Sequence, residues 1–261
     1  MNNQLKILIL MPYYNRPILV KNALNSILES NNFHQNWILL FGDDGSDIPG
    51  KPIVENILGE FKDKIIFFET NNSIEEKLKN GLMLGKYANE IIKNSDADLG
   101  IFLCDDDELV PSYLHNLNNF FIQNKNIDYC YSKIYLYNPL FQKSKNINNK
   151  IQENKYNQYK TPINPVGKLD ASQICWRISC CKEKNAWFNE TTKLEDKPYL
   201  LDTDFSFFKN LFDICGPCYP TNFFSQFKAI HEYQLLWYKN NTKNFLINYN
   251  ENLKKFVGDK F

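Results

Sequence analysis

Three short apolar runs, each followed directly by a polar or acidic turn, constrain the fold of this chain most strongly. They span residues 5–11, 38–41 and 99–104. Runs of this length bounded by turn residues are typical of buried strands, and a helical spacing of apolar residues over 20–28 separates the first two. Strands that alternate with helices predict right-handed crossovers and a mainly parallel sheet, with ligands beyond the carboxyl ends of the strands. The sequence therefore predicts an α/β fold.

The third run ends in three consecutive carboxylates, Asp105, Asp106 and Asp107. Like charges this close raise one another's pKa, so a compensating cation is expected. Oxygen ligands without a histidine or cysteine cluster favour Mg²⁺ or Mn²⁺, and such ions usually share their coordination shell with a phosphate. The triplet therefore predicts a phosphorylated ligand, whereas the alternative interpretation is a solvated acidic turn.

The first two runs end in turns with related chemistry. The second run leads into Asp43-Asp44-Gly45-Ser46-Asp47, where Gly45 allows the chain to reverse. A carboxylate such as Asp44 at a strand end can accept hydrogen bonds from a ribose or a base edge. The first run leads into a segment in which Pro12, Tyr14 and Arg16 offer an aromatic face and a cation. We expect all three turns at one edge of the sheet.

These motifs resemble a known family. The matching segments are Pro12-x-Tyr14-Asn15-Arg16-Pro17, Asp43-Asp44-Gly45-Ser46, the aspartate triplet with Pro111, Ala186-Trp187-Phe188-Asn189-Glu190 and Leu201-Asp202-Thr203-Asp204-Phe205. Together they look like the inverting family-two nucleotide-sugar glycosyltransferases with the GT-A fold. The resemblance extends over roughly residues 5–232.

The resemblance implies a GT-A, Rossmann-like architecture, with a mixed, mainly parallel central sheet flanked by helices. Residues 1–115 would form the nucleotide-sugar-binding half, and residues 116–261 the acceptor-binding and catalytic-base half, of one compact unit. The resemblance also implies a metal-dependent enzyme that transfers a sugar from a nucleoside-diphosphate donor to a glycan or glycolipid acceptor. The transfer would invert the configuration at the anomeric carbon. UDP is the preferred nucleotide, and Mn²⁺ or Mg²⁺ the expected cofactor.

Site residues follow from the same resemblance. The donor-binding residues are expected to be Pro12, Tyr14, Arg16, Asp44, Lys79 and Asp105. For Lys79, a place on a solvated helix face is the alternative. The metal-binding residues are expected to be Asp106, Asp107 and His231.

One residue of the acidic segment departs from the family pattern. Cys104 stands where the family often has an aspartate. Counting back from Pro111 makes Asp106 the direct metal ligand. Asp105 is then expected nearer the ribose, and Asp107 either binds the metal or lies next to its ligands.

Transfer by direct displacement also needs a base, because the acceptor hydroxyl loses its proton as it attacks. Asp202 is the expected base, since it matches the second residue of the family's acidic pair and precedes an apolar helical stretch. Glu195 and Asp196 are the rivals. The alternative role of Asp202 is to cap that helix.

Composition narrows the function classes. The chain of 261 residues is 43% hydrophobic and carries no net charge, so it lacks the basic footprint of a nucleic-acid-binding protein. The apolar run at 7–11 is too short for a signal peptide or a membrane span. These features predict a cytoplasmic protein. The amphipathic pattern over 242–261 predicts a C-terminal helix that packs on the core, with peripheral membrane contact as the alternative.

The seven cysteines are an odd number in a chain without a secretory signal, which favours reduced thiols. Cys215-Gly216-Pro217-Cys218 has the spacing of a thioredoxin-type redox centre, but it follows a predicted helix instead of opening one. We therefore expect a tight turn without redox or zinc chemistry.

Two other functions remain as alternatives. A sugar nucleotidyltransferase would share the sheet and the acidic site, but it usually has a Gly-rich basic loop after the first strand, which this sequence lacks. A non-catalytic nucleotide- or sugar-binding protein would keep the fold without the base.

Overall fold

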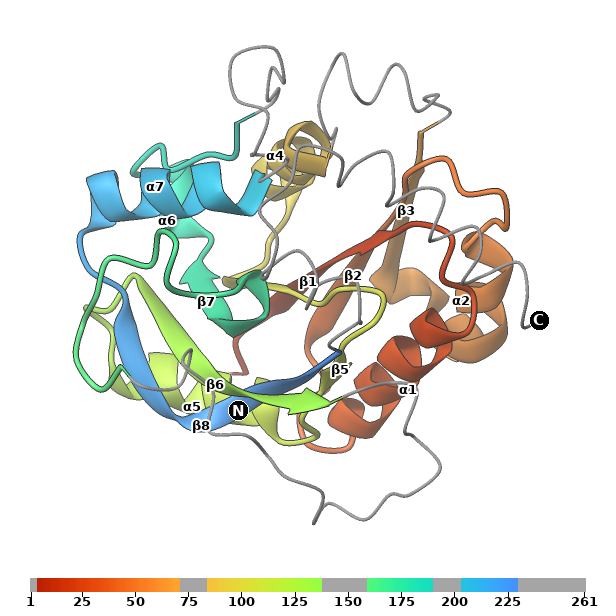
Figure 1. The fold of residues 1–261 in the computed structure, drawn as a ribbon, viewed down its shortest axis with the longest axis horizontal. Helices are drawn as coiled ribbons and strands as arrows, with labels where there is room; N and C mark the ends of the chain where they lie inside the picture. The colour runs from red at the N-terminus through yellow and green to blue at the C-terminus, as the bar shows by residue number, and fades with distance from the viewer. Residues whose placement is uncertain (1–3, 71–83, 138–158, 190–202, 230–261) are drawn as a thin grey trace, which may run out of the picture.

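The computed structural model describes residues 4–70, 84–137, 159–189 and 203–229. Within these residues, eight strands form one sheet in the order β3-β2-β1-β4-β7-β6-β8-β5 (Figure 1). The strands are β1 (Ile7–Tyr13), β2 (Trp37–Asp43), β3 (Ile65–Glu69), β4 (Leu99–Phe102), β5 (Glu108–Leu109), β6 (Tyr129–Tyr137), β7 (Ile174–Arg177) and β8 (Tyr219–Ala229).

The α-helices of the described residues lie on both faces of this sheet (Figure 1). They are α1 (Leu19–Asn31), α2 (Lys51–Leu58), α4 (Leu84–Asn94), α5 (Tyr113–Gln123), α6 (Ser179–Lys182) and α7 (Thr203–Cys215). Two 3-10 helices, η1 (Gly59–Lys64) and η4 (Ala171–Gln173), precede β3 and β7.

The sheet has a parallel half and a mixed half. In the parallel half, β1 pairs with β2 and β4, and β2 pairs with β3. In the mixed half, β7 runs antiparallel to β4 and β6, while β8 pairs in parallel with β6 and antiparallel with β5. The predicted α/β fold with a mixed sheet flanked by helices is confirmed.

Strand β1 shows why these runs fold as central strands. Its side chains alternate between the faces, and all except Pro12 are buried, as expected for a parallel strand covered on two sides. Ile7, Ile9 and Met11 pack in the core formed with α1, α2 and α5. Leu8 and Leu10 pack in the second core, which includes residues of α4, α6 and α7. The sheet is thus held between two apolar layers.

This arrangement brings the three predicted turns to one edge. Because β1, β2 and β4 are parallel neighbours, their carboxyl ends point the same way. The backbone N–H of Asp44 donates to the carbonyl of Tyr13 at 3.1 Å, and that of Leu103 donates to the carbonyl of Leu10 at 3.0 Å. These bonds continue the sheet contacts into the segments that carry the acidic residues.

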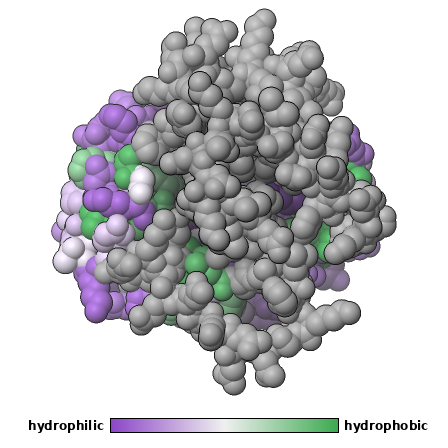
Figure 2. Space-filling model, in the orientation of Figure 1, coloured by the Kyte–Doolittle hydropathy of each residue, from purple (hydrophilic) through white to green (hydrophobic). Residues whose placement is uncertain are grey.

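In the described part of the chain, no helix has the length and apolar character needed to cross a membrane. On the face shown in Figure 2, hydrophobic residues are interspersed among hydrophilic ones over the described surface at the left of the view. The predicted C-terminal helix over 242–261 lies outside the described residues.

Candidate functional site

The turn after β2 is organised by Asp43, the last residue of the strand. One carboxylate oxygen of Asp43 accepts the backbone N–H of Ser46 at 2.9 Å, and the other accepts that of Gly50 at 2.8 Å. Asp43 is buried, so both bonds replace water that the carboxylate loses on folding. Its role is to shape the turn, and this leaves the following carboxylate, Asp44, as the candidate ligand-binding group.

The turns after β1 and β2 are linked directly. The backbone N–H of Asn15 donates to the Ser46 hydroxyl at 3.1 Å, and the Asn15 side-chain oxygen accepts the backbone N–H of Asp47 at 2.8 Å. Asn15 adopts a positive φ of 52°, a conformation that asparagine tolerates better than most residues. The structure therefore brings together the first two motifs, including Pro12, Tyr14 and Asp44.

Asp44 is half-buried beside β3. Its carboxylate accepts a hydrogen bond from the Thr70 hydroxyl at 2.7 Å, and this bond orients the side chain at the carboxyl end of the sheet. Sequence reasoning missed Thr70. Its position directly after the apolar strand β3 was the available signal, because it repeats the pattern of a polar residue at a strand end.

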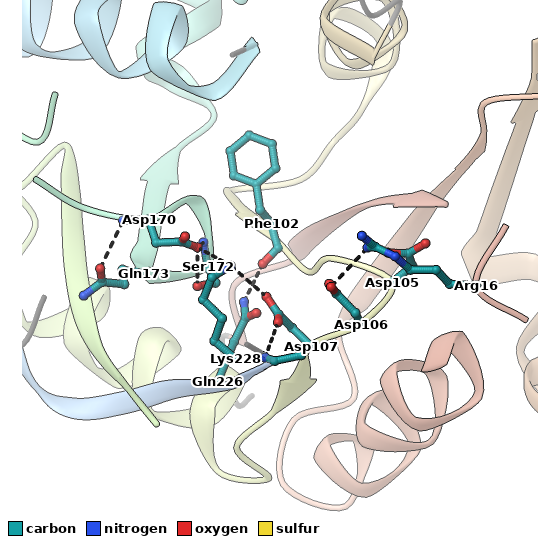
Figure 3. Close-up of polar contacts among 11 residues, drawn as sticks. Arg16, Phe102, Asp105, Asp106, Asp107, Asp170, Ser172, Gln173, Gln226 and Lys228 are labelled. Carbon is teal, nitrogen blue, oxygen red and sulfur yellow. Dashed lines mark hydrogen bonds and ion pairs between the residues drawn. The ribbon is translucent and has the colours of Figure 1, made fainter. Parts of the chain in front are cut away.

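The aspartate triplet follows β4 in a tight turn, in which the backbone N–H of Asp107 donates to the carbonyl of Cys104 at 3.1 Å. Asp105 accepts the backbone N–H of Tyr14 at 3.0 Å and pairs with the Arg16 guanidinium at 2.7 Å. The same Arg16 nitrogen lies 3.1 Å from Asp106. Figure 3 shows Arg16 beside Asp105 and Asp106, where the first motif and the triplet meet as predicted.

Asp107 points to the other side of the turn, toward β8 (Figure 3). One of its oxygens accepts the backbone N–H of Ala229 at 2.9 Å. The Lys228 ammonium lies 3.6 Å from the other oxygen and 3.0 Å from Asp170. Lys228 therefore joins the triplet to a carboxylate that lies far away in the sequence.

Asp170 is held in place by its own short helix. It forms a capping box with Gln173, and its carboxylate also accepts the Ser172 hydroxyl at 2.7 Å. Burial raises the pKa of Asp170, but Lys228 and the bonds from Ser172 outweigh burial and leave the pKa below its usual value. Asp170 is thus an ionised partner for Lys228.

Two carboxylates of the triplet have pKa values above the ordinary range of aspartate. Burial raises the pKa of Asp105 to about 6 against the opposing effect of Arg16, and the Asp106 charge adds to the rise. Burial raises the pKa of Asp107 to about 8 despite the nearby Lys228 ammonium. The pKa of Lys228 lies well above its usual value, because Asp107 and Asp170 outweigh its own burial.

A count of the charged side chains in this cluster shows which ion would compensate their net charge. Four carboxylates, Asp105, Asp106, Asp107 and Asp170, face the two cations Arg16 and Lys228. With every group ionised the sum is −4 + 2 = −2. A divalent cation neutralises that sum, so the donor chemistry fits Mg²⁺ or Mn²⁺.

The geometry also permits a metal. One ligand atom each from Cys104, Asp106 and Asp107 lies within 4.8 Å of the others, and it is the one such group of three among the described residues. Asp106 and Asp107 were expected to bind metal, whereas Cys104 was noted as a departure from the family pattern. Asp105 is not part of this group.

Three predicted site residues, Lys79, Asp202 and His231, lie outside the described residues, as do the rival bases Glu195 and Asp196. The structure does not test these assignments. Of the elements around them, α7 begins at Thr203, directly after Asp202.

The cysteines form no disulfide, since all seven are free. Cys215 is the last residue of α7. The backbone of Cys218 forms an isolated antiparallel β-bridge with Ile163. The Cys-Gly-Pro-Cys segment therefore follows a helix, as predicted, and Gly216 takes the positive φ of 79° that its turn needs.

Comparison with known proteins identifies the class. The sequence matches the model of the glycosyl transferase family 2 over residues 8–225, which is most of the chain. The chain therefore belongs to this family. A comparison with curated proteins found no match.

Solved structures with a similar fold include S. aureus TarS and a mannosyltransferase. S. aureus TarS 1-349 has a TM-score of 0.57 at 16% identity, over 86% of this chain and 60% of that one. TarS 1-349 in complex with UDP-GlcNAc has a TM-score of 0.57 at 15% identity, over 87% of this chain and 59% of that one.

A mannosyltransferase from Pyrobaculum calidifontis, PcManGT, in complex with GDP-Man and Mn²⁺, has a TM-score of 0.55 at 12% identity, over 88% of this chain and 59% of that one. The fold of the chain is thus the GT-A fold. The chain spans about three fifths of the length of each of these structures.

Proposed function

We propose that this chain is a metal-dependent, inverting glycosyltransferase that moves a sugar from a nucleoside-diphosphate donor to a glycan or glycolipid. The observation that carries the proposal is the cluster of four carboxylates and two cations at the carboxyl edge of the parallel sheet. Its six side chains sum to −2 when ionised, and they lie where sheets of this kind bind ligands. Membership in the family supports the same reaction class.

The donor nucleotide would lie over the ends of β1 and β2. Asp44, oriented by Thr70, would accept hydrogen bonds from the base or ribose, with Pro12 and Tyr14 beside it. Asp105 is fixed by Tyr14 and Arg16, and it would face the ribose. In this role Arg16 mainly positions Asp105 and Asp106, while Lys79 is the proposed cation for the diphosphate.

The metal would be held by Asp106 and Asp107, with His231 as a further ligand. A divalent ion bound there would stabilise the charge that develops on the departing nucleoside diphosphate. A side chain of the protein would supply the base. Asp202 would take the proton of the acceptor hydroxyl as that oxygen attacks the anomeric carbon from the opposite face. Attack from that face inverts the anomeric configuration.

UDP is the proposed nucleotide. The two TarS structures with ligand contain UDP and UDP-GlcNAc, and PcManGT contains GDP-Man, so GDP is the main competitor. We further propose that the protein works in the cytoplasm. Membrane contact through residues 242–261 would bring it to a lipid-linked acceptor.

A thermal unfolding panel tests the donor and the metal together. A ligand at about 100 times its dissociation constant stabilises the native state by about 2.7 kcal/mol, which moves the melting temperature by several degrees in a chain of this size. UDP, GDP, CDP and dTDP are measured with and without Mn²⁺. We expect the largest shift for UDP and a requirement for Mn²⁺.

Two variants make this panel specific. Asp106→Asn should lose the metal-dependent shift while it remains folded, whereas Asp213→Asn, an exposed residue of α7, should keep it. Hydrolysis of UDP-sugars with Mn²⁺ then separates an enzyme from a non-catalytic binding protein of the same fold. If no nucleotide shifts the transition with any metal, the proposed function is wrong.

A further inference from the structure

Cys104 is the residue of the acidic turn that the proposed function leaves without a role. It lies directly before the triplet and is partly exposed. Its sulfur and one oxygen each from Asp106 and Asp107 lie within 4.8 Å of one another. Ligands that are 2.0–2.3 Å from a common ion stand about 3–4.5 Å apart, so small side-chain movements would let all three contact one metal.

A second observation at the same place also points to a cation. Asp107 is fully buried, and although one oxygen accepts the Ala229 N–H, its Oδ2 atom has no hydrogen-bond partner among the described residues. Lys228 lies 3.6 Å from that oxygen, beyond hydrogen-bond length. A buried oxygen without a donor is costly and uncommon, but a bound cation would satisfy it.

We propose that Cys104 is a metal ligand, and that its sulfur shifts the preference of the site from Mg²⁺ toward Co²⁺, Zn²⁺ and Cd²⁺. This inference rests on the metal site of the proposed function and changes its composition. A site of carboxylates alone suits hard ions such as Mg²⁺, whereas a thiolate selects softer ions. On binding, the S–H bond breaks, the proton goes to solvent and a metal–sulfur bond forms without any oxidation.

Cobalt gives a direct readout of sulfur coordination, because a thiolate bound to Co²⁺ produces charge-transfer absorption in the near ultraviolet. We expect this band to develop with one equivalent of Co²⁺ and to be absent in Cys104→Ser. Cys215→Ser is the matched control, since Cys215 is also partly exposed but lies at the end of α7. The control should keep the band.

Metal preference is measured by calorimetry with Cd²⁺ and Mg²⁺. Most protein sites bind Co²⁺ more tightly than Mn²⁺ whatever their ligands are. A ranking of metal affinities in one protein therefore does not by itself reveal sulfur coordination. The informative quantity is the ratio of the Mg²⁺ and Cd²⁺ dissociation constants in one protein. In Cys104→Asp, which restores an all-oxygen site, we expect this ratio to fall at least tenfold.

The unmodified protein provides an independent test that does not depend on the folding of a variant. Alkylation of Cys104 by iodoacetamide, followed by peptide mass spectrometry, should be slowed by Cd²⁺ but not by Mg²⁺. Equal alkylation of Cys104 with and without Cd²⁺, under conditions where calorimetry shows Cd²⁺ bound, contradicts the inference.

Other outcomes separate this inference from the proposed function. If metal binds without a charge-transfer band, and Asp106→Asn removes binding while Cys104→Ser does not, the site uses oxygen alone. The inference about Cys104 then fails and the proposed metal site stands. If the band persists in Cys104→Ser but is lost in Cys215→Ser, the metal binds near Cys215 and the inference is overturned. If no divalent ion binds, both proposals fail.

Discussion

The parallel and mixed halves of the sheet contribute to the site in different ways. In the parallel half, the functional side chains lie in the turns that follow the apolar strands β1, β2 and β4. In the mixed half, Lys228 lies within the long strand β8, and Asp170 precedes η4 in a loop. The first half thus places the carboxylates, while the second half supplies a cation and a further carboxylate that fix their charge state.

This difference suggests that donor binding and proton transfer depend on different parts of the molecule. The donor-binding groups are proposed at the ends of β1, β2 and β4, whereas the proposed base Asp202 directly precedes α7 in the second half of the chain. Changes in the parallel half should therefore act mainly on donor binding. Changes near α7 should act mainly on the rate of transfer.

The largest expected effect tests this division at the proposed base. Asp202→Asn keeps the size of the side chain but cannot accept the acceptor's proton. We expect the transfer rate to fall by about 10²- to 10⁴-fold, the usual contribution of a positioned general base, with donor affinity unchanged. Single-turnover kinetics and calorimetry with the donor measure the two quantities separately.

Glu195→Gln is the matched control, because Glu195 belongs to the rival acidic pair. It should change the transfer rate by a small factor. A large loss in Glu195→Gln with a normal rate in Asp202→Asn would assign the base to the rival pair. Loss of donor binding in Asp202→Asn would break the proposed division between the halves.

The parallel half was readable from sequence because its signals are local. A short apolar run followed by a polar turn predicts both a buried strand and the chemistry at its end, and β1, β2 and β4 follow that pattern. The contact between Tyr14 and Asp105 then follows from the parallel order of β1 and β4. The family motifs lie in these same segments.

The contribution of the mixed half could not be predicted in the same way. Lys228 meets Asp107 because β5 pairs with β8, and such a pairing between distant residues leaves no local pattern. Asp170 carried a weak signal, since Asp-x-x-Gln matches a capping box, but the motif indicates a helix start and no partner. Lys228 and Asp170 were therefore missed, whereas Arg16, the other cation beside the triplet, was predicted as a site residue.

The next prediction compares the two cations that compensate the triplet, one from each half. Arg16→Met leaves Asp105 buried beside Asp106 without its 2.7 Å partner, and Lys228→Met leaves Asp107 and Asp170 without theirs. Removal of one partner from a buried ion pair typically costs about 3–5 kcal/mol. We expect a loss of that order from each variant in metal-free buffer, measured by urea unfolding.

A surface pair provides the contrast. Lys209 and Asp213 of α7 are paired but largely exposed, so Lys209→Met should cost less than about 0.5 kcal/mol. Addition of Asp105→Asn to Arg16→Met should recover part of the loss, because it removes the uncompensated charge. Equal stability of Arg16→Met and the unmodified protein would mean that Arg16 does not compensate the triplet.

A smaller effect is expected at the junction of the two halves, where β4 meets β7. A Cβ atom on Gly100 would lie 2.4 Å from the ring of Trp176, which is fully buried and cannot move aside freely. Overpacking of this kind costs about 1–3 kcal/mol, so Gly100→Ala should lower the free energy of unfolding by that amount. Thermal or urea unfolding measures the change.

Gly59 is the control for this substitution, because nothing lies within 4 Å of its Cβ position and its φ of −58° suits alanine. Gly59→Ala should leave stability unchanged or raise it by about 0.4–1 kcal/mol. A Gly100→Ala variant as stable as Gly59→Ala would show that the junction is loosely packed. The two halves could then shift against each other more easily than the buried Trp176 implies.

The smallest expected effect concerns acid sensitivity in the parallel half, away from the site. The ring of His34 is buried between the ends of α1 and β2, and its Nε2 atom lies 3.0 Å from the carbonyl of Leu5 and 3.2 Å from that of Asn36. Burial lowers the pKa of His34 below its ordinary value of 6.5, although the two carbonyls oppose this effect.

The sign of the pH effect follows from this lowered pKa. The unfolded chain binds a proton at His34 near pH 6.5, while the folded chain resists it until the pH is lower. Stability from the neutral ring is therefore present above pH 6.5 and is lost as the pH falls from 6.5 toward the folded-state pKa. His34→Gln, which can still donate to a carbonyl, should reduce this slope, and His115→Gln, at an exposed position of α5, should nearly keep it. Urea unfolding at several pH values below 7 makes the comparison. An unchanged slope in His34→Gln would show that His34 does not cause the acid sensitivity. The triplet is not the alternative source, because the raised pKa values of Asp105 and Asp107 add stability as the pH falls.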